Sequence, residues 1–173
     1  SIMTAERDSP LLAATRFNHT DIAIALIQAR ARPNSVDRFG DTPLWNAIAR
    51  GNRAVVRALL RAGADANLAH EDDGRTPLLA AVEAGQRRIV KLLLNAGASP
   101  NLADEDGTTP LMIVRDVKIA QALLARGAQR GARNKAGRTA LDIARQEGRD
   151  EIVQVLEGRV GGEAGPSTDT GGS

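Results

Sequence analysis

The sequence predicts an all-α solenoid in which antiparallel helix pairs stack side by side and hairpin loops, or fingers, connect them. Three observations predict it. The triplet Thr-Pro-Leu begins at Thr42, Thr76 and Thr109, with spacings of 34 and then 33 residues. A glycine closes several of these copies, and apolar residues recur at helical intervals between the triplet and this glycine. A unit of this length buries its apolar face only by stacking onto its neighbours.

The composition fits thin stacked helices. The 173 residues are 42% hydrophobic and 25% charged, which allows a substantial core and gives no sign of disorder. Two Phe, one Trp and no Tyr leave Ala, Leu, Val and Ile to build the interior, and the absence of Cys excludes disulfides and thiolate chemistry. The formal net charge of +2 identifies no partner. We find no run of 18 apolar residues and therefore expect no membrane span.

The first helix of each copy starts at the Thr-Pro pair. In the third copy, the Thr76 hydroxyl can cap the helix, and Pro77 takes the first position, where its missing donor costs nothing. The helix is short and ends at Gly85. One column of this helix is leucine at Leu11, Leu44, Leu78, Leu111 and Leu141, and another is mostly alanine at Ala14, Ala47, Ala81, Val114 and Ala144. Small residues there let neighbouring helices approach closely.

The second helix starts near Gln86 and turns back antiparallel to the first. Ile89, Val90 and Leu93 recur at helical spacing, so the helix is amphipathic. Gly97 supplies a left-handed end, and Gly63 and Gly127 repeat it. Arg30 stands at that position in the first copy, where a left-handed backbone costs about 1 kcal/mol.

These motifs in register resemble the ankyrin repeat family. The chain shows the glycine turn at Asp73-Gly74, the Thr-Pro-Leu inner helix, the outer helix with Ile89-Val90-Lys91, and the loop Gly63-Ala64-Asp65-Ala66-Asn67. The resemblance covers about residues 4–158. It implies an L-shaped stack that binds other proteins through its concave inner-helix face and its finger tips.

We divide the chain into an ankyrin repeat domain at 4–158, with a short start and a tail. The repeats lie at about 4–36, 37–69, 70–103 and 104–133, followed by a C-terminal cap at 134–158. Residues 1–3 read as a cloning remnant. Residues 159–173 are rich in Gly and read as a disordered tail or linker.

Two departures from the period mark special places. We interpret His70 as one extra residue that lengthens the third finger. Three residues are missing near Val114-Arg115-Asp116, so we expect the fourth inner helix to be about one turn short and to leave a notch.

The candidate binding surface is built around the aromatic residues. Trp45 shares a column with Leu12, Leu79 and Met112, and we predict an apolar stripe there with Phe39 beside it; packing between repeats is the alternative. The predicted partner-binding set is Phe17, Arg38, Phe39, Trp45, Arg50, Asp72, Asp73, Arg75, Leu79, Glu83, Glu105, Asp106 and Met112.

Six carboxylates fall at the tips of the third and fourth fingers: Glu71, Asp72, Asp73, Asp104, Glu105 and Asp106. They form either a negative rim that speeds encounter with a basic partner or ordinary solvated turns.

Catalysis and nucleic-acid binding have little support. His19 and His70 are the two histidines, and neither has a partner residue at motif spacing; phosphate loops and metal motifs are absent from the sequence. We expect no enzyme activity, no cofactor, no metal and no nucleic acid, since the outer-helix cations lie away from the aromatic residues.

We therefore expect a non-enzymatic module that binds a partner protein, with inhibitor, immunity-type partner and accessory factor as open roles. The alternative is an architectural spacer within a larger protein. We expect a monomer in the cytoplasm, or in the periplasm or outside the cell if a leader has been removed. The high Ala, Arg and Gly content favours a bacterial source.

Overall fold

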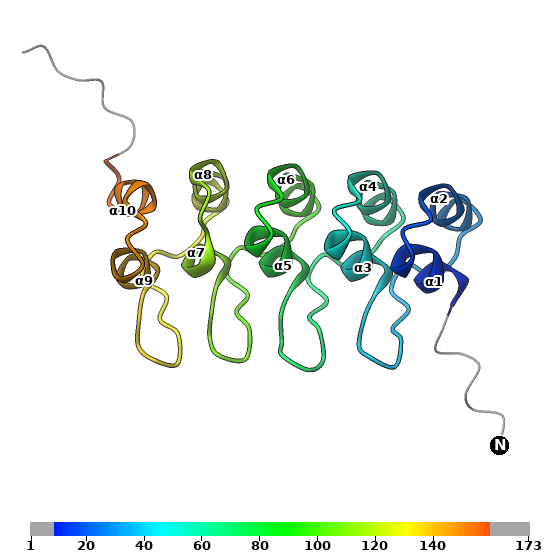
Figure 1. Ribbon diagram of the computed structural model, residues 1–173, viewed down its shortest axis with the longest axis horizontal. Coiled ribbons are helices and arrows are strands. Elements are labelled where there is room, and N and C mark those ends of the chain that lie inside the picture. The colour runs from blue at the N-terminus through cyan, green and yellow to red at the C-terminus, as the bar shows by residue number, and fades with distance from the viewer. Residues whose placement is uncertain (1–8, 160–173) are drawn as a thin grey trace, which may run out of the picture.

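The computed structural model describes residues 9–159, which form two parallel rows of helices with fingers projecting from one row (Figure 1). The inner row contains α1 (Pro10–Arg16), α3 (Pro43–Ala49), α5 (Pro77–Glu83), α7 (Pro110–Ile113) and α9 (Ala140–Gln146). The outer row contains α2 (Thr20–Gln28), α4 (Arg53–Arg61), α6 (Arg87–Asn95), α8 (Val117–Ala125) and α10 (Asp150–Leu156). No strand occurs within the described range, so the predicted all-α solenoid is confirmed. The expected remnant at 1–3 and residues 160–173 of the expected tail lie outside that range.

The inner helices begin as the Thr-Pro pairs predict. The Thr42 hydroxyl accepts the backbone N–H of Trp45 at 3.1 Å, and the Thr76 hydroxyl accepts that of Leu79 at 3.2 Å. Each hydroxyl satisfies one of the amide groups that a helix start leaves without a partner. Within the described residues, no helix is long and apolar enough to cross a bilayer.

Leucine and small residues fill the space between neighbouring inner helices. Leu11, Leu44, Leu78 and Leu111 are each 1% exposed, whereas Leu141 in the last repeat is half-buried. The alanine column at the next turn is equally closed, which lets the inner helices approach one another. The core is therefore one continuous layer shared by all repeats.

A ladder of asparagines joins the outer-helix ends of successive repeats. The Asn34 Nδ2 donates to the Gly63 carbonyl at 3.2 Å, while its Oδ1 accepts the backbone N–H of Asp65 at 2.8 Å. Asn67 makes the same two bonds to Gly97 and Ser99, and Asn101 makes them to Gly127 and Gln129. The three glycines have φ between 84° and 89°, as the sequence predicts. Arg30 adopts the same left-handed backbone with φ 61°.

The fourth inner helix is short, as predicted. The helix α7 has four residues against seven in α5, and Val114 leaves it with an extended backbone. The expected notch is filled by Arg149 of the next repeat, whose side chain is 8% exposed. Its Nη1 donates to the Val114 carbonyl at 2.6 Å and its Nη2 to the Met112 carbonyl at 3.0 Å. A guanidinium thus replaces the hydrogen bonds of the missing turn.

Burial lowers the pKa of Arg149, and the Glu147 carboxylate at 3.1 Å from its Nη2 acts against that shift. An arginine remains charged despite such a shift, so it keeps donating to both carbonyls.

We expect Arg149→Ala to lower the free energy of unfolding by about 2 to 4 kcal/mol, because two buried carbonyls lose their donor and a void forms. Urea denaturation followed by circular dichroism measures it. The matched control is Arg145→Ala, whose side chain is 58% exposed and pairs with Glu157; it should change stability little. Equal stability of the two variants would show that Arg149 does not support the short repeat.

Candidate protein-binding surface

The fingers are closed by one recurring side-chain acceptor. In finger 2 (37–41), the backbone N–H of Asp37 donates to the Asp41 carbonyl at 3.1 Å, and the Asp37 Oδ1 accepts the N–H groups of Phe39 and Asp41 at 2.8 and 3.0 Å. Asp104 does the same in finger 4 (104–108), and Asn134 in finger 5 (134–138). A carboxylate or amide oxygen at this position fixes the tight turn.

In finger 3 (70–75), His70 takes the place of that acceptor. Its backbone N–H donates to the Arg75 carbonyl at 2.8 Å, and its Nδ1 accepts the N–H of Asp72 at 3.3 Å. The extra residue therefore lies in the loop at 71–73, and the interpretation of His70 itself as the insertion is wrong. The longer third finger is confirmed.

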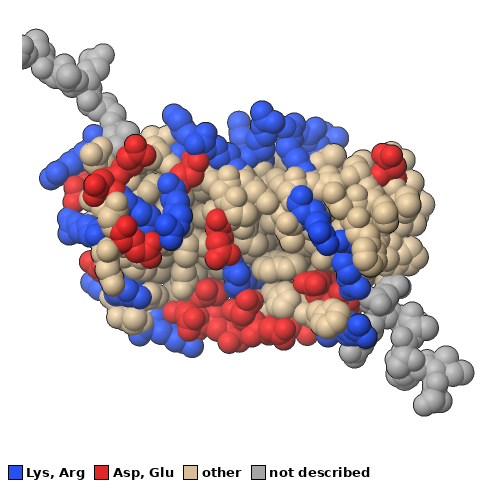
Figure 2. Space-filling model, viewed as in Figure 1, with Lys and Arg blue, Asp and Glu red and all other residues tan. Residues whose placement is uncertain are grey.

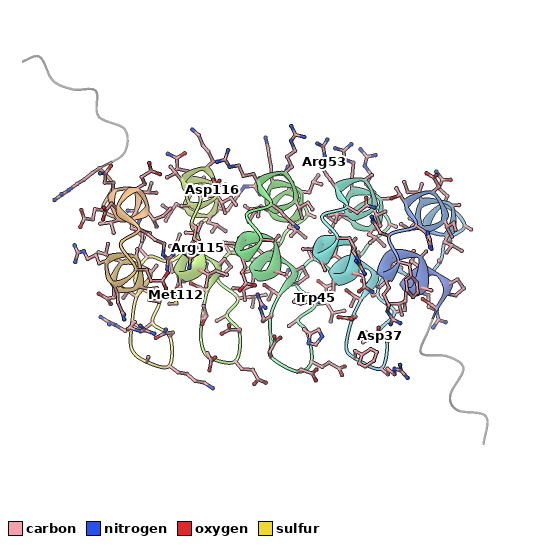
Figure 3. All side chains as sticks on the ribbon, in the orientation of Figure 1. Asp37, Trp45, Arg53, Met112, Arg115 and Asp116 are labelled. Carbon is pink, nitrogen blue, oxygen red and sulfur yellow. The ribbon has the colours of Figure 1, made fainter. Side chains whose placement is uncertain are left out.

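His70 also links finger 3 to the helix and finger before it. Its ring centroid lies 5.2 Å from that of Trp45, and its Nε2 lies 3.5 Å from the Asp41 Oδ1. Trp45 is half-buried, and Figure 3 shows it on the finger side of α3. The His70 ring packs at a tilt beside the indole, which stays partly accessible. This pairing was not predicted from the sequence, and the signal that could have found it is the shared register of Asp37 and His70.

A second cluster lies at the base and tip of finger 2. Arg16 from α1 pairs with the buried Asp37 carboxylate, and its guanidinium carbon is 6.0 Å from the centre of the Phe39 ring. The Arg38 guanidinium carbon is closer to that ring, at 4.7 Å. Phe39 is nevertheless 52% exposed. The tip of finger 2 is therefore an exposed aromatic ring with two guanidinium groups beside it.

The predicted apolar stripe is not present on the surface. Leu12 and Leu79 are each 1% exposed and Met112 is 0% exposed, so they pack between repeats and offer nothing to a partner. The prediction of Leu79 and Met112 as partner-binding residues is therefore wrong. Only Trp45 of that column remains partly accessible.

Acidic residues gather along the middle of the finger row (Figure 2). Asp72, Glu105 and Asp106 are exposed, and Asp73 is partly exposed. The fingers support one another, since the N–H of Glu105 donates to the Asp73 carbonyl at 3.0 Å and that of Lys135 to the Asp106 carbonyl at 2.9 Å. The acidic tips are thus held at fixed spacing.

Of the other predicted residues, Phe17, Arg50 and Glu83 lie at the C-terminal ends of inner helices and Arg75 at the end of finger 3. Phe17 is 65% exposed at the end of α1. Arg50, in the same register, donates its Nε to the Arg16 carbonyl at 3.1 Å. Arg75 pairs with Glu83, so both charges are engaged within one repeat.

No group of three or more His, Asp or Glu side chains within residues 9–159 is arranged to hold a metal ion.

Burial and the neighbouring Asp37 carboxylate raise the pKa of Asp41, while His70 and Arg16 act to lower it. Because the folded pKa lies above 3.8, ionisation of Asp41 begins to oppose folding as the pH rises past 3.8 and does so fully above the folded pKa. We expect Asp41→Asn to unfold at higher urea than the wild type at pH 7, with the difference disappearing as the pH falls below 3.8. Asp72→Asn, on the exposed tip of finger 3, is the surface control. Lower stability of Asp41→Asn at pH 7 would show that the attraction of His70 and Arg16 outweighs burial.

Comparison with known proteins places this geometry in a family. A family model described as ankyrin repeats in three copies matches residues 10–104 and 89–161. The chain is 32% identical over 157 residues to the mitochondrial disaggregase of Bos taurus, covering 88% of this chain and 23% of that protein. It is 42% identical over 67 residues to the human neurogenic locus notch homolog protein 4, covering 39% of this chain and 3% of that protein.

The chain thus spans less than a quarter of the length of these two relatives. Both are mammalian, so the expected bacterial source stays a prediction. Ankyrin repeats are generally protein–protein interaction modules. Because the family model matches almost the whole described range, the chain belongs to the ankyrin repeat family.

Proposed function

We propose that this chain is a non-enzymatic module that binds a partner protein at the tip of finger 2 and along the acidic fingers beside it. The observation that carries the proposal is Phe39, a phenylalanine 52% exposed at a finger tip with the Arg38 guanidinium over its ring. Aromatic and arginine side chains dominate the binding energy of protein interfaces.

The apolar part of the surface is small and well defined. Phe17 and Phe39 are two of the four large hydrophobic residues that are strongly exposed within the described range. Arg16 lies near the Phe39 ring, and Phe17 follows Arg16 at the end of α1. Trp45 adds a partly accessible indole. We expect the partner to offer an apolar pocket to Phe39.

Charge gives the partner a second property. Asp72, Asp73, Glu105 and Asp106 stand on adjacent fingers, so a partner with basic residues beside its apolar pocket gains attraction without burying these carboxylates fully. Exposed charges of this kind mainly raise the rate of association. The exposed Arg50 lies at the C-terminal end of α3.

Inhibitor, immunity-type partner and accessory factor all remain roles in which such a surface would serve. The alternative is an architectural spacer within a larger protein. The chain spans only a small share of the length of its relatives, so the experiments below also test this alternative.

We expect Phe39→Ala to weaken capture of the partner from a lysate of the source cells by at least about tenfold, because a central aromatic anchor is lost. Affinity capture followed by mass spectrometry measures the retained protein. Ile22→Ala is the matched control, since Ile22 is 55% exposed on α2, in the outer row; it should capture the partner as the wild type does.

A charge test separates steering from anchoring. Asp72→Lys with Glu105→Lys should slow association at low salt and leave dissociation nearly unchanged. Retention of one protein by wild type and Phe39→Ala alike would show that finger 2 is not the anchor. If the wild type, Phe39→Ala and Ile22→Ala all retain no protein above background, the chain is an architectural spacer and not a binding module.

A further inference from the structure

A groove with a volume of about 390 Å³ runs between α6 and α8, in the outer row and away from the fingers. Its floor is apolar and consists of Val90, Leu94, Ile119, Ala122 and Ala125. The volume falls in the range of natural ligand sites. The proposed function uses the fingers, so this groove stands apart from it.

The groove exists because α8 carries small residues where α6 carries larger ones. Both helices have nine residues, so their positions correspond one to one. At the sixth position α6 has Leu92 and α8 has Ala122; at the ninth, α6 has Asn95 and α8 has Ala125. Leu92 is half-buried and packs against the core. The chain thus shows in its own third repeat which side chain would fill the groove.

Four cations line the groove and no carboxylate does: Arg87, Lys91, Lys118 and Arg126. Arg126 is held in place, since its Nη1 donates to the Leu94 carbonyl at 2.6 Å and its Nη2 to the Asn95 Oδ1 at 2.5 Å. Arg87 pairs with Asp116, beside the groove. Lys91 and Lys118 are exposed and make no ion pair within the described residues. The rim therefore carries uncompensated positive charge.

We infer that this groove docks an acidic amphipathic peptide segment of another protein, with its apolar side chains on the alanine floor and its carboxylates against Lys91 and Lys118. An apolar floor framed by cations requires both properties in one ligand. A nucleic acid backbone would use the cations and leave the floor bare. A nine-residue helix is about 13.5 Å long, so the groove fits about two and a half turns of a helical peptide.

The probe is a fluorescein-labelled 14-residue peptide with leucine on one helical face and glutamate on the other. Fluorescence anisotropy with the full chain should show saturable binding, and amide shifts in a heteronuclear NMR spectrum should cluster at Ala122, Ala125 and Leu94. A peptide of the same pattern with lysine for glutamate should not bind. Rising salt should weaken binding of the glutamate peptide.

Two variants test the groove itself. Ala122→Leu introduces the residue of the preceding repeat and should weaken binding at least about tenfold by occupying the floor. Lys91→Glu with Lys118→Glu should weaken it to a similar extent by reversing the rim. Arg61→Glu, an exposed charge reversal on α4, is the matched control and should bind as the wild type does. Circular dichroism of each variant should match the wild type, since Leu92 already fits this register.

Three outcomes would overturn the inference. Undiminished binding to Ala122→Leu would show that the peptide does not enter the groove. If Arg61→Glu weakens peptide binding as much as the lysine reversals do, the binding depends on the overall charge of the protein and not on the groove. Binding of dodecanoate with no binding of the peptide would make a fatty carboxylate the occupant. Loss of peptide binding through Ala122→Leu leaves Phe39-dependent capture intact, so failure here and failure of the proposed function are told apart.

Discussion

The glycine carbonyl at the end of α4, α6 and α8 accepts a hydrogen bond from an asparagine of the preceding repeat. Asn34, Asn67 and Asn101 each donate to the terminal glycine of the next repeat and accept an N–H two residues further on. The same glycines require the left-handed backbone that frees the carbonyl for this bond. Side-chain amides therefore bridge successive repeats along the outer-helix ends, while the leucine columns fill the space between neighbouring inner helices.

Changes in repeat length are tolerated because a neighbouring repeat supplies what the change removes. Four residues instead of seven in α7 leave the Met112 and Val114 carbonyls exposed to the interior, and Arg149 reaches across to satisfy them. The insertion in finger 3 is accommodated because His70 takes the acceptor position and packs against Trp45. In both cases a long or planar side chain covers a gap in the regular pattern, so the stack continues without a break.

The sequence was sufficient for the helix pairs, their starts at Thr-Pro, the glycine ends and the shortened α7, because each rests on local chemistry repeated at a fixed period. The sequence was insufficient to predict that Leu12, Leu79 and Met112 are buried. A residue in this column can contact either a partner or the adjacent helix, and the distance between repeats decides which of the two it contacts. Trp45 is too large for that space and stays half-buried. The α6/α8 groove was within reach of the sequence, because Ala122 stands where Leu92 stands one repeat earlier.

The separation of acidic finger tips from basic outer helices gives the molecule a property that its formal charge of +2 conceals (Figure 2). Arg53, Arg57, Arg88 and Lys91 lie on the outer helices, while Asp72, Glu105 and Asp106 lie on the fingers. Opposite charges at the two edges of a stack add to an electric dipole directed across it. The electric field of a charged macromolecule therefore orients this protein before contact. The edge that makes first contact depends on the sign of the charge on the approaching surface.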